Sequence, residues 1–120
     1  MILLDTHALI WLLAGNRRAR KLPANARLFL SPVSLLELRL LEELGRIELL
    51  GGREALEEDG RFAIDDPSST ALFAASLDLP WTRDPFDRLI AGHARMRGWR
   101  LATADARLLE HLPAGSVFEL

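Results

Sequence analysis

The sequence predicts an α/β domain built on a central, mostly parallel sheet. Short apolar runs alternate along the chain with segments of helical periodicity, which is the pattern of βα units. The first run, Ile2–Leu4, is apolar at every position, as in strands that are covered on both faces. The chain has 120 residues, which suits one domain, so we expect residues 1–120 to form a single unit.

In the first half of the chain, capping residues delimit the helices that follow each strand. Thr6 is placed to cap a helix that stops at Gly15, a residue type that readily adopts the left-handed conformation of helix ends. Ser31-Pro32 is a typical start for a second helix, which ends near Gly45. The elements predicted here are a strand at Ile2–Leu4, a helix through Leu13, a basic stretch at Arg17–Lys21, a strand at Leu28–Leu30, a helix from Ser31, and a short polar helix at Arg53–Asp59 after the Gly51-Gly52 turn.

In the second half, proline motifs mark two helix starts. Asp65-Asp66-Pro67-Ser68 leads into one helix, and Pro85 begins a long helix that Gly98 ends. The elements predicted here are a weak extended segment at Phe62–Ile64, a helix at Ala71–Leu77, a loop at Leu79–Asp84, a helix at Pro85–Arg97, a strong strand at Trp99–Thr103, a helix at Asp105–Leu112 and an edge strand at Ser116–Phe118.

The composition excludes several classes of protein. There are no cysteines, which rules out a disulfide scaffold, a thiolate zinc site and a cysteine nucleophile, and fits a cytoplasmic location. Met1–Gly15 is apolar but lacks a basic start and carries Asp5 and His7, so we expect a buried strand and helix rather than a signal peptide, and no membrane segment. The net charge is −2, but 14 of the 15 basic residues are Arg, a planar partner for phosphate.

Acidic residues follow the predicted strands at the edge where parallel sheets bind ligands. Asp5 comes directly after the first strand, and Asp105 follows the strand that ends at Thr103. Because the carboxyl ends of parallel strands meet at one edge, we expect these two carboxylates to share it. Asp84-Pro85-Phe86-Asp87 places two more acids at a helix start, with Asp84 as the N-cap and Asp87 in the first turn.

Glu37 is the least ordinary of the candidate acids. Its neighbours at helical spacing are all apolar: Val33, Leu40, Leu41 and Leu44. Glu37 therefore lies on the stripe that is expected to face the core. An unpaired buried carboxylate is costly, so Glu37 needs a cation, hydrogen bonds or a proton, and Arg95 or Arg97 is a candidate partner.

Four acids from separated segments are thus expected to converge on one pocket: Asp5, Glu37, Asp87 and Asp105. Each also has a purely structural explanation, since acids at helix starts interact favourably with the helix dipole. Crowded carboxylates repel one another, and a hard divalent cation such as Mg²⁺ or Mn²⁺ relieves that repulsion. Such a site can activate water and stabilise the charge that grows on a phosphodiester, which is nuclease chemistry.

The remaining candidates are weaker. The three histidines, His7, His93 and His111, lack the spacing of a metal motif, although His7 lies close enough to Asp5 to line a site. Thr6 and Thr103 are candidate hydrogen-bonding neighbours of the acids. The three tryptophans, Trp11, Trp81 and Trp99, are expected in the core or at partner contacts rather than as platforms for nucleobases.

Four segments of the sequence resemble the motifs of a known family. Ile2-Leu3-Leu4-Asp5-Thr6-His7-Ala8 resembles the start of PIN-domain ribonucleases, particularly the VapC-like toxins of type II toxin–antitoxin pairs. The other three follow in the family's order: Ser31 to Leu38 with Glu37, Asp84 to Ala94 with Asp87, and Thr103-Ala104-Asp105. The resemblance runs from residue 2 to about residue 110, and residues 45–80 carry no diagnostic motif. Gly92 stands where the family usually has Ala.

The resemblance implies a PIN-like three-layer α/β/α sandwich that acts as a metal-dependent endoribonuclease toxin. It implies that Asp5, Glu37, Asp87 and Asp105 are catalytic and hold Mg²⁺, or Mn²⁺ in its place, together with the attacking water. Because relatives are endoribonucleases, it also implies an RNA substrate. Relatives are often dimeric and are silenced by an antitoxin whose tail covers the site, so it further implies a homodimer and an antitoxin on a separate chain.

Two alternatives stay open at this point. A phosphorylation receiver domain also gathers acids and Mg²⁺ at strand ends, but it needs a lysine beside its aspartyl phosphate, and the sole lysine, Lys21, lies in the basic stretch. A catalytically silent PIN-fold module would bind RNA or protein without cutting, and the presence of all four acids disfavours it.

Overall fold

The computed structural model describes residues 1–120, and its centre is a five-stranded sheet in the order β3-β2-β1-β4-β5. Every neighbouring pair of strands is parallel, so the sheet predicted as mostly parallel is parallel throughout. All five strands lie where the sequence predicts them, with shifts of one residue at the last two. They are β1 (Ile2–Leu4), β2 (Leu28–Leu30), β3 (Phe62–Ile64), β4 (Arg100–Thr103) and β5 (Val117–Glu119).

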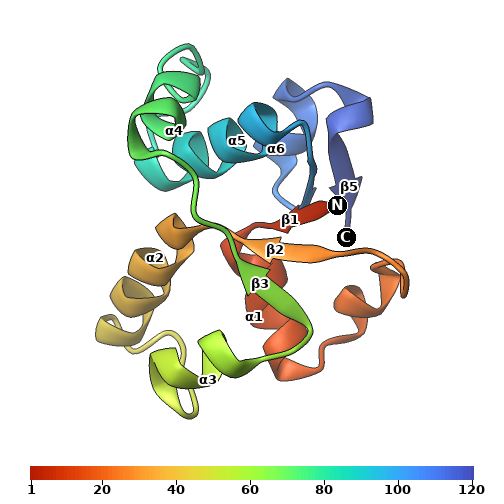
Figure 1. The fold of residues 1–120 in the computed structure, drawn as a ribbon, viewed down its shortest axis with the longest axis vertical. Coiled ribbons are helices and arrows are strands. Elements are labelled where there is room, and N and C mark those ends of the chain that lie inside the picture. The colour runs from red at the N-terminus through yellow and green to blue at the C-terminus, as the bar shows by residue number, and fades with distance from the viewer.

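Helices cover both faces of this sheet and form the predicted three-layer sandwich. Helices α4, α5 and α6 gather on one side, while α1 and α3 lie on the other (Figure 1). The helical elements are α1 (Thr6–Ala14), η1 (Arg17–Lys21), α2 (Pro32–Glu43), α3 (Gly52–Glu58), α4 (Ser69–Ala75), α5 (Pro85–Arg97), α6 (Ala106–His111) and η2 (Ala114–Ser116), where η marks a 3₁₀ turn. None of these helices is both long and apolar enough to cross a lipid bilayer.

The side chains of β1 alternate between two apolar cores. Ile2 and Leu4 pack in one core with Leu38 of α2, whereas Leu3 packs in the other with Ile90 of α5. Because successive side chains of a strand point to opposite faces, a strand covered on both faces must be apolar at every position. This explains the uninterrupted apolar run at the start of the chain.

The first helix is capped by a different residue from the one predicted. Asp5, not Thr6, is the N-cap of α1, and its Oδ1 accepts a hydrogen bond of 2.7 Å from the backbone N–H of Ala8. Asp is the more effective N-cap of the two residue types. The Thr6 hydroxyl is buried and instead donates to Ser34 Oγ at 3.0 Å, which joins α1 to α2.

Beyond Val33, which packs against the core, the apolar stripe of α2 does not face the core as predicted. Leu40 and Leu44 are 39% and 67% exposed, and the buried face is formed by Ser34 and Leu38. The prediction was wrong because α2 packs against the rest of the domain mainly along its first two turns, and its second half extends beyond the sheet. Periodicity alone does not reveal where along a helix the packing ends.

Gly92 allows α4 to pack directly against α5. A Cβ at this position would overlap Ser76 Oγ and would lie 3.1 Å from the carbonyl carbon of Ala75. Ser76 Oγ is itself held, because it donates to Leu72 O at 2.8 Å. The glycine that departs from the family's usual alanine therefore has a packing reason, which outweighs the roughly 1 kcal/mol that Gly costs inside a helix.

Polar residues follow the strands at the carboxyl edge of the sheet. The pairing register places Asp65, Ser31 and Asp5 side by side after β3, β2 and β1. The backbone continues to pair there, since Asp65 N donates to Leu30 O at 2.9 Å. From this row, Ser31 caps α2, and Ser31 and Asp65 contact α5.

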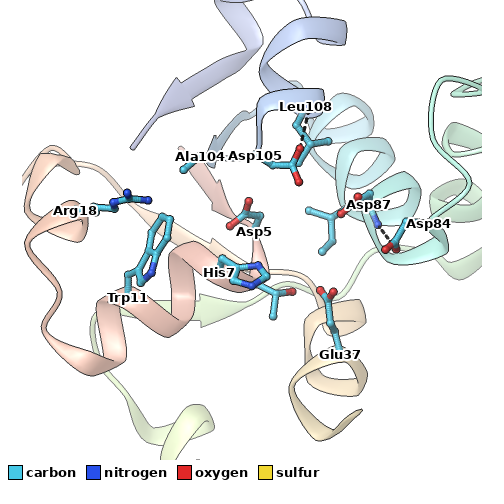
Figure 2. Close-up of a pocket in the computed structure, with 12 residues that line it drawn as sticks. Asp5, His7, Trp11, Arg18, Glu37, Asp84, Asp87, Ala104, Asp105 and Leu108 are labelled. Carbon is cyan, nitrogen blue, oxygen red and sulfur yellow. Dashed lines mark hydrogen bonds between the residues drawn. The ribbon is translucent and has the colours of Figure 1, made fainter. Parts of the chain in front are cut away.

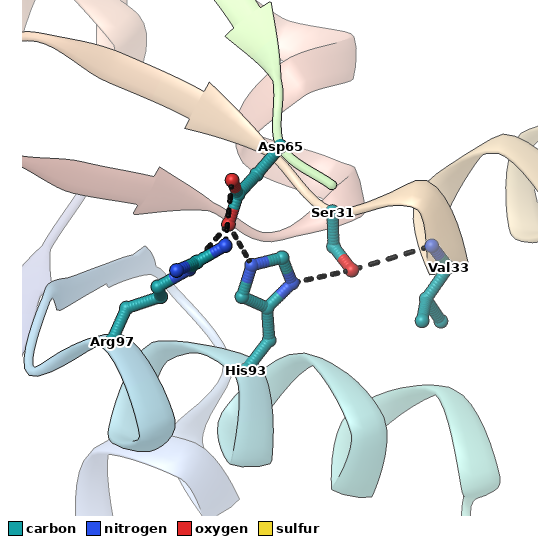
Figure 3. Close-up of polar contacts among 5 residues, drawn as sticks. All are labelled: Ser31, Val33, Asp65, His93 and Arg97. Atoms are coloured by element: carbon teal, nitrogen blue, oxygen red, sulfur yellow. Dashed lines mark hydrogen bonds and ion pairs between the residues drawn. The ribbon is translucent and has the colours of Figure 1, made fainter. Parts of the chain in front are cut away.

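His93 of α5 connects to this row through a buried chain of hydrogen bonds (Figure 3). Its Nε2 lies 2.7 Å from Asp65 Oδ2 and its Nδ1 lies 2.9 Å from Ser31 Oγ. Burial lowers the pKa of His93, so the imidazole is neutral. Because the ionised carboxylate only accepts, Nε2 carries the hydrogen, and Nδ1 accepts the hydroxyl hydrogen of Ser31. Ser31 Oγ in turn accepts from Val33 N at 3.3 Å and caps α2.

Arg97 balances the charge at the end of this chain. Its Nε lies 2.8 Å from Asp65 Oδ2 and its Nη2 lies 3.1 Å from Oδ1. Although burial opposes ionisation, the hydrogen bonds from His93 and Arg97 hold the pKa of Asp65 below its usual range. The chain therefore fixes α5 to the ends of two strands and to the start of α2.

We expect Asp65→Ala to lower the free energy of unfolding by about 2–3 kcal/mol, because it leaves the buried His93 and the Arg97 guanidinium without their acceptor. Asp78→Ala is the matched control, since Asp78 pairs with Arg95 of the same helix at 2.8 Å but is 66% exposed. Urea unfolding of both variants at pH 7 checks this. Equal effects of the two substitutions would show that the buried chain does not hold α5.

Candidate active site

An open pocket of about 390 Å³ lies at the carboxyl edge of the sheet. Its lining includes five acidic side chains, namely Asp5, Glu37, Asp84, Asp87 and Asp105. The four acids expected to converge do line this one pocket, and Figure 2 shows their carboxylates directed toward a common space. Their roles in metal binding and catalysis stay predictions.

Three of the acids are held in place as helix caps. Asp5 caps α1, Asp84 caps α5 as predicted, and Asp105 caps α6. The Oδ1 of each accepts backbone hydrogen bonds of 2.7–3.3 Å, whereas Oδ2 takes no part in the cap. Three helix N-termini therefore meet at the pocket, where their dipoles favour negative charge.

Glu37 and Asp87 reach the pocket from the sides of α2 and α5, which pack against each other. No ion pair neutralises either of them. The arginines considered as partners for Glu37 are engaged elsewhere, because Arg95 pairs with Asp78 and Arg97 pairs with Asp65. Asp87 accepts no hydrogen bond from the protein, so both of its oxygens are free for a ligand.

The pocket disfavours the ionised forms of its acids. Burial, together with the negative charge of Asp84, Asp105, Glu37 and Asp5, raises the pKa of Asp87 to about 7. Burial also raises the pKa of Glu37, and the charges of Asp84 and Asp5 add to the effect. Burial raises the pKa of Asp5, an effect that hydrogen bonds from Thr103 and from the Ala8 N–H partly offset. The protein alone therefore leaves this negative charge incompletely compensated.

The donor set suits a hydrated hard cation. No group of three or more His, Asp or Glu side chains is arranged to hold one metal ion directly. Mg²⁺, however, usually keeps several of its waters and uses only one or two protein carboxylates. Oxygen donors that carry an excess of negative charge around an open space of this size fit that mode of binding.

The two threonines next to the acids position them. Thr103 is buried, and its Oγ1 accepts a hydrogen bond of 3.0 Å from Asp105 N, while its side chain also binds Asp5. Thr103 thus links the acid that follows β1 to the acid that follows β4. Thr6 fixes α1 to α2 through Ser34, and His7 lies exposed at the pocket wall.

Among the polar and aromatic residues of the lining, sequence reasoning did not place Asp84, Trp11 and Arg18 in the pocket. Trp11 is half-buried against the core, as expected, but it also lines the pocket. Its position four residues after His7 was an available signal, because residues four apart share a helix face. Arg18 had no such signal, since its place depends on how η1 folds back on α1.

The other aromatic candidates lie outside the pocket. Trp99 stacks on Phe29 with ring centroids 4.2 Å apart. Trp81 stacks on His111 at 4.9 Å. These tryptophans therefore belong to the packing, and His93 belongs to the buried chain described above rather than to the pocket.

The fold and the pocket together define a class of α/β domains that gather acidic side chains at the carboxyl edge of an all-parallel sheet. The chain belongs to the PIN-domain family, whose model, described as "PIN domain", matches residues 2–113.

Known proteins are similar to this chain in sequence or in fold. The chain is 35% identical over 119 residues to "Ribonuclease VapC22" of Mycobacterium tuberculosis, and the match covers 92% of this chain and 91% of that protein. A solved "Toxin-antitoxin complex from Klebsiella pneumoniae" contains a similar chain with a TM-score of 0.72 and 20% identity, covering 100% of both chains. FitAcB from Neisseria gonorrhoeae is similar with a TM-score of 0.59 and 24% identity, covering 100% of this chain and 96% of that one.

We expect Asp87→Asn to stabilise the metal-free protein at pH 8. An acid whose pKa is raised from 3.8 to about 7 contributes stability below pH 3.8 that is lost as the pH rises through 7. Allowing for solvent screening of this half-exposed group, the gain at pH 8 should be about 1–2 kcal/mol, with little difference at pH 4. Urea unfolding in the presence of a chelator measures it, with Asp66→Asn as an exposed control. A variant less stable than the wild type at pH 8 would contradict the electrostatic interpretation.

Proposed function

We propose that this chain is a Mg²⁺-dependent endoribonuclease, with Mn²⁺ able to replace Mg²⁺, and that it acts as the toxin of a type II toxin–antitoxin pair. The observation that carries the proposal is the pocket of five carboxylates, in which the pKa of Asp87 rises to about 7. Membership of the PIN-domain family and the name of the relative from Mycobacterium tuberculosis support it.

The proposed metal ligands are Asp5, Asp87, Glu37 and Asp105, either directly or through water. When bound, Mg²⁺ would supply an activated water and would stabilise negative charge on the phosphodiester. The chain's own part is to fix the geometry. The cap at Asp105 leaves its Oδ2 free toward the pocket, the cap at Asp5 uses only Oδ1, and the unbonded carboxylate of Asp87 can accept a proton from an attacking water.

The two alternatives have less support. Lys21 is exposed in η1 and does not line the pocket, so a receiver-like site would lack its cation. The sheet order β3-β2-β1-β4-β5 also differs from the 2-1-3-4-5 order of receiver folds. A silent RNA- or protein-binding module would have no need to hold four uncompensated acids in one pocket.

An antitoxin on a separate chain and a homodimer are part of the proposal. One of the similar solved structures is described as a toxin–antitoxin complex. Surfaces for such contacts are offered by exposed apolar side chains: Leu36 and Leu40 on α2 with Leu44 at its C-cap, and Phe73 on α4 with Leu77 in the turn that follows it. RNA is the proposed substrate, and a cytoplasmic location follows from that substrate.

We expect Asp5→Asn, Glu37→Gln and Asp87→Asn each to reduce RNA cleavage by about 100-fold or more, because each removes charge that the pocket needs around the cation. Asn retains the capping ability of Asp at position 5, so the fold should remain. A fluorescent single-stranded RNA incubated with Mg²⁺ and purified protein measures the rate, and circular dichroism checks the fold.

Asp78→Asn is the control for this series, since it removes an exposed acid outside the pocket and should cleave like the wild type. A chelator should stop cleavage, and added Mg²⁺ or Mn²⁺ should restore it. Full activity of Asp5→Asn or Asp87→Asn, or cleavage that a chelator does not affect, would refute the proposed site.

A further inference from the structure

Arg18 is the one basic side chain, apart from His7, in the lining of the acidic pocket. It forms no ion pair with the five acids, and its guanidinium donates no hydrogen bond to the protein. All five of its N–H donors are therefore free for a ligand. The Arg18 guanidinium thus lines the same pocket as five carboxylates and pairs with none of them, so another contact holds it.

Trp11 provides that hold. The Arg18 Cζ lies 4.8 Å from the centroid of the Trp11 ring, within the range of a cation–π contact. The indole is half-buried against the core, and the backbone of η1 is fixed because Asn16 Oδ1 accepts from Arg18 N at 2.9 Å. Both ends of the Arg18 side chain are thus positioned before any ligand binds.

The pair lies on one side of the pocket, while Asp84 and Asp87 lie on the other, with Asp5 between them (Figure 2). A polyanion that enters this pocket meets carboxylates over most of the lining. Arg18 is the only guanidinium in the lining, and a guanidinium binds phosphate through two parallel hydrogen bonds.

We propose that Arg18, held by Trp11, binds a non-scissile phosphate of the RNA and so sets the side from which the strand crosses the pocket. This inference rests on the proposed ribonuclease function. Arg18 then contributes binding that is equal in the ground state and the transition state, and it is a substrate-positioning residue that does not touch the reacting atoms. Trp11 acts through Arg18.

The first test measures cleavage kinetics of a short fluorescent RNA. Arg18→Gln should raise KM roughly ten-fold with little change in kcat, because uniform binding is lost. Arg17→Gln is the matched control, since Arg17 carries the same charge in the same turn but does not line the pocket, and its KM should change less than two-fold. A fall in kcat at constant KM, or equal effects of the two substitutions, would overturn the assignment.

The second test measures RNA binding as a function of salt by fluorescence anisotropy, in an Asp87→Asn background, which slows cleavage, and with a chelator in place of Mg²⁺. Arg18→Gln should reduce the slope of log K against log salt by about 0.7, the value for one lost phosphate contact on a single strand. Arg18→Lys should restore that slope but not the full affinity, because Lys keeps the charge and loses the flat contact with Trp11. An unchanged slope in Arg18→Gln would overturn the proposal.

Two readouts separate this inference from the proposed function. The Mg²⁺ concentration for half-maximal cleavage should be unchanged in Arg18→Gln. If Arg18 instead only neutralised the acids, its removal would strengthen Mg²⁺ binding and lower that concentration. Such a fall would overturn the assignment of Arg18 to a phosphate. If the wild type cleaves RNA but the Arg18 variants behave like Arg17→Gln, the role of Arg18 is refuted and the proposed ribonuclease function is not. A wild-type protein that neither cleaves nor binds RNA refutes the proposed function and, with it, the inference.

Discussion

The buried imidazole of His93 joins α5 to the rest of the domain. On one side it donates to Asp65 at the end of β3, and on the other it accepts from Ser31, the cap of α2. The acidic pocket depends on this arrangement, because α5 carries Asp87 and α2 carries Glu37, and their like charges repel across the gap. A chain in which every donor and acceptor has a partner, closed by the Arg97 ion pair, is stiff enough to keep the two helices at their spacing.

Conformational stability and the chemistry of the pocket oppose each other here. The fold concentrates carboxylates where three helix N-termini meet, and the dipoles of those helices offset part of the cost. Burial and the charges of the neighbouring acids nevertheless raise the pKa of Asp87 to about 7, so part of that cost remains. A bound divalent cation would remove that residual cost, so folding and metal affinity are linked. Sites that break local rules of stability in this way are typical of function rather than of packing.

Local sequence signals predicted the strands and the convergence of the acids. Strand positions follow from apolar runs that must be covered on both faces, and Asp5 and Asp105 follow strands whose carboxyl ends share one edge. What could not be predicted depends on tertiary geometry. The exposure of Leu40 and Leu44 depends on how far α2 extends beyond the sheet, and the place of Arg18 depends on how η1 folds back. The role of His93 needed Asp65 and Ser31 to be neighbours, a fact of strand order that no local pattern contains.

Asp5, Asp84 and Asp105 cap helices with the same carboxyl groups that line the pocket. Glu37 and Asp87 also line the pocket, but they cap no helix. Mutations in these two groups of acids therefore have different consequences for the fold. Under the proposed function, a mutation at position 37 or 87 would silence the chain while its shape survives, and the inactive chain would still occupy a partner that recognises the active one. At positions 5 and 105, most replacements also remove a helix cap, which destabilises the fold by about 0.5–2 kcal/mol and raises the fraction of unfolded chain open to proteases. Among natural variants that keep the fold but have lost activity, we accordingly expect more changes at positions 37 and 87 than at positions 5 and 105.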